Sequence, residues 1–481
     1  MTKEDMICEE HFIKTHYREK SLRYVVRRPF KEPPPAVNDS YQVAVSRLKR
    51  VERALKGQPT LWSMCKDFMY EYEPSNHMKL VQPGEQQPLI YLPHHHVCQL
   101  ASSSTKLRDV FDGSSKINDL CSLNDRLYRG HKLEKNIVDV ITHFRFPAIV
   151  CTADIHQMFR QIQVDREDQQ FQGIVWRDNP SKPIQSYRLA TVTYGLITSP
   201  YHALKQLALD EQDTYPIGAQ ILLKDFYVDK VMTGGDSLRE VLHKIHELIA
   251  LLNQGGFELR KWASNHHVAL QHIPSEHQIK GVSFKEDIDS TIKILGINWN
   301  TTNDTFTFWA EPMKTISYLT KRELLSEIAK NFDPCGWLAP LVVVAKLIMQ
   351  QLWEDHIPQH LFNAWKIHRT SFKFLNTFEV PRHIINSSEH STFLLHGFSD
   401  SSEKAYATVV YIVSTQEHSV PTLLADNYEN STFNIKERTV QCSMPLTPTS
   451  STSPSLQLLN RHSNLERLQR IVSYIIRFCR N

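Results

Sequence analysis

Two short hydrophobic segments that each run up to an aspartate constrain the fold of this chain more than any other feature. Residues 147–154, PAIVCTAD, end at Asp154, and residues 224–230, KDFYVDK, contain Asp229. Helix-forming sequence follows the first and turn-forming sequence follows the second, so both segments are predicted to be strands that end at their carboxylates. A mixed sheet can place the two strand ends side by side.

Adjacent carboxylates repel one another unless a cation lies between them. Mg²⁺ is the usual ion, because it binds carboxylate oxygens together with substrate phosphates. Two such ions can clamp an in-line attack on phosphorus. From spacing alone this is a weak signal, since any mixed α/β protein carries acidic residues at strand ends.

Length and composition indicate a globular chain. At 481 residues, several packed units are expected, and 22% charged with 41% hydrophobic residues is ordinary for folded proteins. The net charge of +3 gives no argument for a nucleic-acid partner. Residues 1–60 hold thirteen Lys/Arg against eight Asp/Glu, which fits either a basic patch or, more simply, a solvated helix face.

The cysteines and the N-terminus bear on location. Eight scattered cysteines without a CxxC pair argue against a zinc module and a disulfide scaffold, and they favour a reducing compartment. The N-terminus lacks the apolar region of a secretory signal, and no run approaches the ~20 apolar residues of a membrane span. We therefore expect an intracellular, cytoplasmic protein without a membrane partner. The histidines His94–His96 alternate faces on a predicted strand, which disfavours a metal site there.

Hydrophobic periodicity predicts the other elements. We expect helices at 40–56, at 238–252 behind a Ser237 cap, and at 320–355 with an interruption at DPCGWLAP. Strands are expected at 88–97, and in pairs at 219–234 (folded about 228–230), 293–309 (with its turn at 301–304) and 393–412. Residues 443–455 read as a Ser/Thr/Pro linker, before a helical pattern at 456–479.

Six motifs in order carry a resemblance to a known family. They are STKLRDVFDGSSKINDLCSLND (104–125), TADIHQMFRQIQV (152–164), TYGLITSPY (193–201), YVDK (227–230), GGFELRKWASN (255–265) and ILGINW (294–299). They resemble the reverse transcriptase region of the Pol polyprotein of Pao/BEL-type long-terminal-repeat retrotransposons. TKRELLSEIAKNFDPCGWLAP (320–340) resembles the segment named Pao retrotransposon peptidase, and HGFSDSSEKAYATVVY (396–411) resembles the start of a ribonuclease H domain.

The resemblance implies an α+β, right-hand polymerase with fingers, palm, thumb, connection and a truncated ribonuclease H-like segment. The implied division is an N-terminal helical, basic region (1–85), fingers and palm (86–270), thumb and connection including the peptidase-named segment (271–385), the ribonuclease H-like segment (386–440), and a linker with a C-terminal helix (441–481). It also implies two Mg²⁺ ions, an RNA or DNA template–primer and deoxynucleotides as partners.

Site residues carry over motif by motif. Asp154 would bind both Mg²⁺ ions with the Ile155 carbonyl as an auxiliary ligand, and Asp229 would be the second metal carboxylate. Phe159 would be the steric gate against a ribose 2′-OH, with a core aromatic as the alternative reading.

The remaining implied residues contact the nucleotide. Arg108 would brace the triphosphate, since its guanidinium fork matches phosphate oxygens, and Asp112 would order the fingers loop. Tyr194 and Gly195 would line the nucleotide pocket, and Lys261 or Arg260 would protonate departing pyrophosphate, although a solvated cation is the commoner role for such a residue.

Lys230 departs from the family, which has a second aspartate in YVDD at this position. An ammonium in place of a carboxylate beside a dication site changes two charge units, and at ~4 Å and an effective dielectric of ~20 each unit interaction is about 4 kcal/mol. We therefore expect an RNA-directed DNA polymerase region that is degenerate; the alternative is a catalytically inactive nucleic-acid-binding remnant. In the ribonuclease H-like segment only Asp400 has a matching context, and the peptidase-named segment offers no assignable nucleophile or acid pair.

Overall fold

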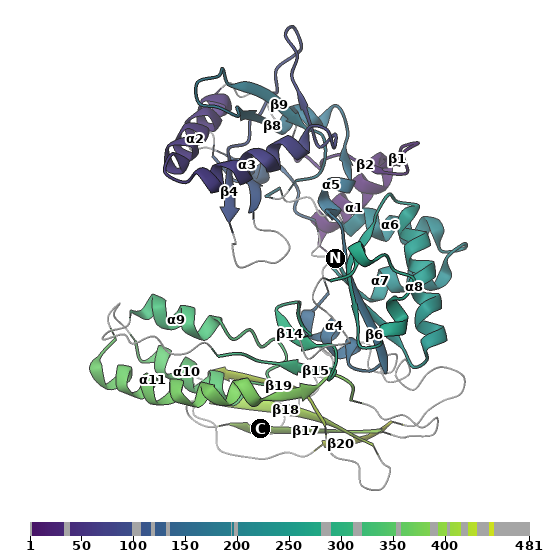
Figure 1. Cartoon of the computed structure of the whole chain (residues 1–481), viewed down its shortest axis with the longest axis vertical. Helices are drawn as coiled ribbons and strands as arrows, with labels where there is room; N and C mark the ends of the chain where they lie inside the picture. The colour runs from purple at the N-terminus through teal and green to yellow at the C-terminus, as the bar shows by residue number, and fades with distance from the viewer. Residues whose placement is uncertain are drawn as a thin grey trace. The chain divides into compact units, whose positions relative to one another are not determined.

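A computed structural model of the chain (Figure 1) describes residues 2–32, 39–98, 107–116, 121–130, 135–193, 195–196, 201–279, 290–310, 320–352, 357–384, 393–401, 405–414, 422–430 and 442–446. Helices and small sheets make up these residues, in agreement with the predicted α+β class. The chain divides into two compact units: Met1–Glu134, Ile155–Lys224 and Ile245–Leu259 form the first, and Lys135–Asp154, Asp225–Lys244 and Arg260–Asn481 form the second. None of the described helices is long and apolar enough to cross a membrane.

The first unit combines helices with three small sheets. Its helices are α1 (Lys3–Thr15), α2 (Asp39–Leu55), α3 (Pro59–Tyr72), α5 (Met158–Gln161), α6 (Tyr201–Glu211) and α7 (Pro216–Lys224). Its sheets have the orders β1-β2-β7, β3-β9-β8 and β4-β5. The strands are β1 (Tyr17–Arg18), β2 (Tyr24–Val26), β3 (Met78–Leu80), β4 (His94–Cys98), β5 (Leu107–Phe111), β7 (Gln163–Val164), β8 (Gly173–Trp176) and β9 (Gln185–Leu189).

Helix α2 confirms the predicted helix at 40–56 and explains where the core of this unit lies. Ala44 and Leu48, one helical turn apart, are both about 1% exposed. They belong to a hydrophobic cluster that also contains Met69 of α3, Ile174 of β8 and Leu189 of β9. The two helices therefore bury their apolar stripes with the small sheets.

A four-stranded sheet with the order β10-β11-β6-β12 carries the predicted carboxylates and lies in the second unit. Its strands are β6 (Ile149–Ile155), β10 (Phe226–Tyr227), β11 (Lys230–Gly235) and β12 (Leu259–Ser264). Strand β6 is buried along most of its length, as expected from its unbroken apolar run. Helix α4 (Ile137–Phe144) contacts β10 and β11.

Part of the predicted strand pair at 219–234 is helical. Residues up to Lys224 belong to α7, and β10 is only two residues long. Pro216 opens the helix, where proline's fixed φ is favourable, and Ala219 and Leu222 are buried one turn apart. A short apolar run fits a buried helix as well as a buried strand, which is why its periodicity did not separate the two. Helix α8 (Leu238–Asn253) follows, and Glu240 donates its backbone N–H to the hydroxyl of the predicted cap, Ser237, at 3.3 Å.

Two further sheets and three helices complete the second unit. One sheet, β13-β14-β15-β16, contains β13 (Thr291–Ile294), β14 (Ile297–Asn300), β15 (Thr305–Thr307) and β16 (Glu379–Pro381). The other, β19-β18-β17-β20, contains β17 (Phe393–Ser401), β18 (Ala405–Ser414), β19 (Thr422–Asn430) and β20 (Cys442–Leu446). The helices are α9 (Lys321–Ala329), α10 (Ala339–Gln350) and α11 (Gln359–Ser371).

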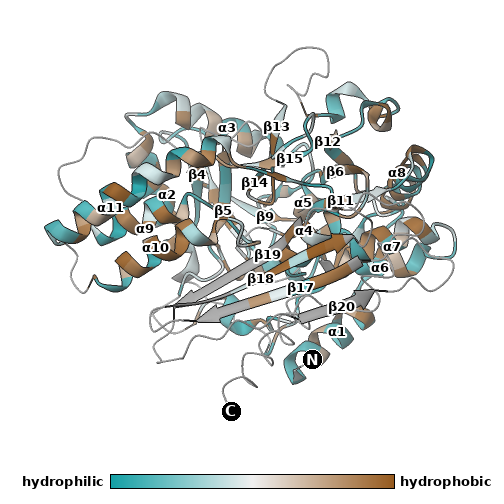
Figure 2. Ribbon diagram, turned by 90° about the horizontal axis from the view of Figure 1, so that it is seen from below, coloured by the Kyte–Doolittle hydropathy of each residue, from teal (hydrophilic) through white to brown (hydrophobic). Residues whose placement is uncertain are grey.

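Several predictions for this region are confirmed. The β14–β15 hairpin turns at 301–304, the helical stretch after residue 320 is broken between α9 and α10, and β17 pairs antiparallel with β18. Figure 2 shows hydrophobic stretches along β17, β18 and α10, and α10 contacts both α11 and β19. The predicted linker overlaps β20, whereas the predicted helix at 456–479 lies outside the described residues.

One hydrophobic core joins these elements. It includes Val150 of β6, Met232 of β11, Trp299 of β14, Leu324 of α9 and Trp365 of α11. The helices after residue 320 therefore pack into the same core as the strand that bears Asp154.

A buried arginine network reinforces this connection. Arg382 is fully buried and donates to both carboxylate oxygens of Asp304, at 2.6 and 2.7 Å. It also donates to the carbonyls of Phe144, Pro147 and Ala148 at 2.7–3.0 Å. All five donors of its guanidinium are thus used, and they tie the start of β6 to the end of β16.

Candidate functional site

Asp154 and Lys230 form the centre of the site because of the register of two neighbouring strands. Strands β6 and β11 are antiparallel, and Asp154 lies directly opposite Lys230. Directly opposed residues place their side chains on the same face of a sheet. The Lys230 ammonium forms an ion pair with Asp154 Oδ1, and both side chains are largely buried, at 16% and 18% exposure.

Lys261 reaches the same carboxylate from β12, on the other side of β6. Its Nζ lies 3.1 Å from Asp154 Oδ2. Lys261 has a φ of +57°, a left-handed conformation that is uncommon for a residue other than glycine. Each oxygen of Asp154 therefore has its own ammonium partner, an arrangement that sequence analysis did not predict.

Asp229 lies in the two-residue turn between β10 and β11. Tyr227 pairs with Lys230 across this turn, and Val228 has a φ of +58°, which is strained for a β-branched side chain. Burial and then the charge of Asp154 raise the pKa of Asp229, against the opposing effect of Lys230 and Lys261. The structure thus brings the two predicted carboxylates into electrostatic contact at one end of the sheet.

These residues do not fit a Mg²⁺ site. Magnesium demands near-octahedral oxygen ligands at ~2.1 Å, but both oxygens of Asp154 already accept from ammonium groups. Within the described residues, no group of three or more His, Cys, Asp or Glu side chains can hold a metal ion. A dication ~4 Å from an ammonium would be repelled by about 8 kcal/mol at an effective dielectric of ~20. The two lysines occupy the electrostatic role that divalent ions have in the implied site.

Several of the other predicted site residues belong to the first unit, whereas Arg260 lies on β12 in the second. Arg108 is exposed on β5, Phe159 is half-buried in α5, and Ile155 is the buried last residue of β6. Tyr194 lies outside the described residues. Their roles toward a nucleotide or a metal stay predictions.

Gly195 has a structural reason to be glycine. Its φ is +96°, and a Cβ at this position would lie 2.1 Å from the carbonyl oxygen of Phe111. Its own carbonyl accepts a hydrogen bond from the Asn124 side chain at 3.0 Å. The residue therefore allows its loop to pack against the end of β5, whether or not it also lines a nucleotide pocket.

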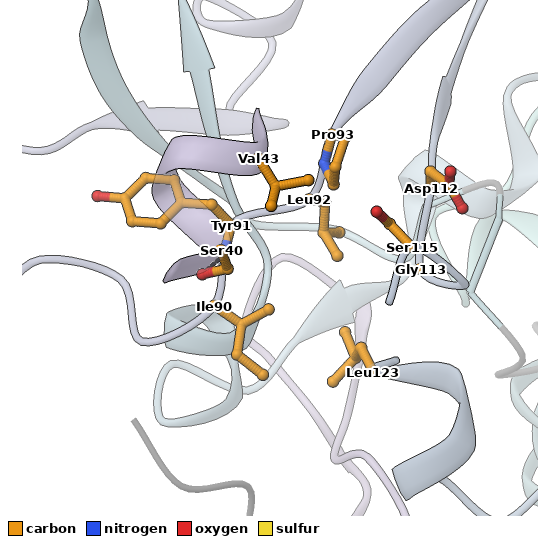
Figure 3. Close-up of a pocket in the computed structure, with 10 residues that line it drawn as sticks. All are labelled: Ser40, Val43, Ile90, Tyr91, Leu92, Pro93, Asp112, Gly113, Ser115 and Leu123. Carbon is orange, nitrogen blue, oxygen red and sulfur yellow. Dashed lines mark hydrogen bonds between the residues drawn. The ribbon is translucent and has the colours of Figure 1, made fainter. Parts of the chain in front are cut away.

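Asp112 makes hydrogen bonds within its own loop and to a neighbouring one, and its role in a fingers domain stays a prediction. It accepts a hydrogen bond from the backbone N–H of Ser114 at 3.2 Å, and its own N–H donates to the Pro93 carbonyl. Figure 3 shows it at the edge of a cavity beside Leu92 and Leu123. At about 10 Å³ this cavity is close to the lower limit for one water molecule, so it is not a nucleotide site.

The C-terminal segment contains two further residues with side chains capable of chemistry, Asp333 and Cys335, besides the predicted Asp400. Asp400 lies on β17 opposite Ala407 of β18. Asp333 accepts from the backbone N–H groups of Trp337 and Leu338, at 2.9 and 2.6 Å, so it orders the start of α10. Burial raises the pKa of the Cys335 thiol to about 12, which disfavours the thiolate that a nucleophile needs. These contacts explain both residues as structural.

Comparison with known proteins gives one positive result. No curated protein matches the chain. Residues 320–426 match the family described as the Pao retrotransposon-like RNaseH-like domain. The matched residues extend across the expected domain boundary at 386. They include the peptidase-named segment at 320–340, so the family description assigns this segment to a ribonuclease H-like domain. This segment supports a Pao/BEL-type retrotransposon Pol as the source of the chain.

Proposed function

We propose that this chain is a non-catalytic nucleic-acid-binding remnant of a Pao/BEL-type retrotransposon Pol, in which the reverse transcriptase region has lost its divalent-metal site. The observation that carries the proposal is the pairing of both Asp154 oxygens with Lys230 and Lys261. Phosphoryl transfer depends on positioning and on neutralising charge with metal ions. A carboxylate already neutralised by two internal ammonium groups does not supply that function.

The ribonuclease H-like match supports the nucleic-acid part of the proposal. In the resemblance described above, the ancestral activity is RNA-directed DNA synthesis with two Mg²⁺ ions, deoxynucleotides and a template–primer. Asp154 and Asp229 still lie at one end of the sheet, which favours residual polymerase activity as the second candidate. The two candidate functions differ in their dependence on divalent ions: the binding remnant needs none, whereas the residual polymerase needs Mg²⁺.

A binding experiment on the full chain tests the first candidate. Fluorescence anisotropy with an RNA–DNA template–primer should give the same Kd, within about twofold, in Mg²⁺ and in EDTA, because no ion bridges the protein to phosphate. Mn²⁺ or Mg²⁺ should leave the melting temperature unchanged. Failure to bind any nucleic acid, or binding that is lost in EDTA, contradicts the proposal.

Primer extension on an RNA template tests the second candidate. Lys230→Asp should gain Mg²⁺-dependent thermal stabilisation and some template-directed synthesis, starting from a wild type near background. Lys224→Asp makes the same charge change at an exposed position of α7 and should gain neither. Robust extension by the wild type would show that the polymerase is active and that Lys230 is tolerated.

A further inference from the structure

A polar surface cavity of about 470 Å³, widely open to solvent, lies within the first unit. Nine residues line it, from the loop between β1 and β2, the end of α3 with the loop after it, the segment around α5 and the turn after α8. Eight of the nine have polar or charged side chains, and the ninth is Gly256. Pockets for bases, drugs and apolar cofactors are lined mainly by hydrophobic side chains, so this cavity is suited to a small, strongly hydrated group.

Arg23 is held in place at this cavity. Its Nε donates to the Gln161 carbonyl at 3.0 Å, and its Nη2 donates to the Gln161 side chain at 3.2 Å. Gly256, with a φ of +71°, leaves room for the Arg23 stem, because a Cβ there would lie 3.2 Å from Arg23 Cγ. Within the described residues, Arg23 Nη1 has no hydrogen-bond partner. A positioned guanidinium edge with donors to spare is the usual recognition element for an oxyanion.

His77 supplies a second, independent observation. It lines the cavity, it is 4% exposed, and its Nδ1 is buried without a hydrogen-bond partner among the described residues. A buried polar atom left unsatisfied is costly, and in native structures it usually marks a bound water, ion or ligand. Burial, Arg160 and Arg23 lower the pKa of His77 to about 4, so its imidazole is neutral at pH 7.

The acidic groups around the cavity are engaged by neighbouring side chains. Glu71 is the cavity's one acidic lining residue, and its Oε1 accepts from the Gln157 amide at 2.8 Å and from the Arg160 guanidinium at 3.3 Å. Arg160 is buried against the ring of Tyr72, with its guanidinium carbon 4.3 Å from the ring centroid. Glu19 accepts from the hydroxyl of Ser21 at 3.2 Å and its charge acts on Arg23, so the charges around the cavity are close to balanced. An anion would therefore be recognised by the unused donors of Arg23 rather than by a net positive charge.

We propose that this cavity binds a phosphate monoester group, which the Arg23 guanidinium and the His77 imidazole contact from its walls. The hydroxyl group of Ser75 lines the same cavity and can donate to one of the remaining oxygens, whereas the Ser21 hydroxyl already donates to Glu19. The group can belong to a free nucleotide or to the 5′ end of a nucleic-acid strand, since the two share the same chemistry. This site lies in the first unit and does not depend on the proposed function of the carboxylate–lysine site.

Calorimetric titration of the full chain with inorganic phosphate at constant ionic strength tests the proposal. Ser75→Asp adds a carboxylate to the lining at an exposed position, so it should fold normally and weaken phosphate binding at least about tenfold. Arg23→Gln removes the cation and should weaken binding by a similar factor. Arg27→Gln is the matched control, because Arg27 pairs with Glu167 and does not line the cavity.

Two nucleic-acid ligands then identify the source of the phosphate. If strand ends are the ligand, an oligonucleotide with a 5′ phosphate should bind more tightly than its 5′-hydroxyl counterpart, and Ser75→Asp should abolish the difference. If free nucleotides are the ligand, deoxyadenosine monophosphate should compete with inorganic phosphate while the two oligonucleotides bind equally. No binding of phosphate by the wild type, or equal binding by wild type and Ser75→Asp, overturns the proposal.

Discussion

Arg382→Met is expected to be among the most destabilising single substitutions in the second unit. The substitution leaves Asp304 without its bidentate partner and removes donors from the carbonyls of Phe144, Pro147 and Ala148, of which Ala148 keeps a donor from Asn265. Removing one partner of a buried ion pair costs about 3–5 kcal/mol. Asp304 is 22% exposed and keeps hydrogen bonds from Trp299 and Asn265 at 3.0 Å, so we expect the lower end, about 3 kcal/mol.

Urea unfolding followed by tryptophan fluorescence and by hydrogen exchange measures this loss. A chain of two units need not unfold in one step, so the exchange of amides in β6, β15 and β16 is the local readout. Arg322→Met makes the same substitution at an exposed position of α9 and should change stability by less than about 0.5 kcal/mol.

A double substitution tests the physical reason. If Arg382→Met lowers stability because it leaves the Asp304 carboxylate without a cationic partner, the double variant Arg382→Met with Asp304→Leu should lose less stability than the sum of the two single variants. Equal stability of Arg382→Met and Arg322→Met would refute the reasoning. Exact additivity in the double variant would show that the arginine acts by packing rather than by pairing with Asp304.

Two further predictions concern the first unit. The pKa of His77 is lowered from 6.5 to about 4, so its contribution to stability is present above pH 6.5 and is lost as the pH falls toward 4. The free energy of unfolding should fall by about 3 kcal/mol across this range. His77→Asn should remove this pH dependence from a stability–pH profile measured by urea unfolding. Gly195→Ala should lower the free energy of unfolding by at least about 2 kcal/mol, because it adds a steric clash with Phe111 to an unfavourable φ. Gly84→Ala, at a φ of +90° in open space, isolates the backbone part of that cost, and equal losses in both variants would argue against the clash.

Local sequence patterns predicted several individual elements, because helix stripes and hairpin turns are set by nearby residues. The α2 stripe, the break between α9 and α10 and the 301–304 turn all follow from spacings of a few residues. Helix α7 was missed because an apolar run of this length has no distinguishing period. Pro216 at its start and Lys224 at its end were the available signals.

Contacts between distant residues could not be predicted in this way. Lys261 meets Asp154 across 107 residues, and Arg382 meets Asp304 across 78. The positions of lysines and arginines along the sequence do not predict such pairs, because each pair depends on which strands become neighbours in the fold. The resemblance supplied the two aspartates, the departure at Lys230 and Lys261 as a candidate nucleotide contact. It did not supply the ion pair between Lys261 and Asp154, which follows from the β10-β11-β6-β12 strand order.

Charge balance at this end of the sheet predicts that Lys230→Asp changes the affinity of the site for a divalent ion more than other single substitutions do. Asp154 and Asp229 are balanced by Lys230 and Lys261, so with all four groups ionised the site is neutral without a metal ion. Lys230 is 16% exposed and fixed opposite Asp154, whereas Lys261 is 44% exposed and can turn its ammonium toward water. Lys230→Asp would leave three carboxylates and one mobile ammonium, a net charge of two negative units that one divalent ion would neutralise. We therefore expect Lys230 to determine whether the site binds a divalent ion. Lys261 alone would not prevent such binding, because its ammonium can turn toward water.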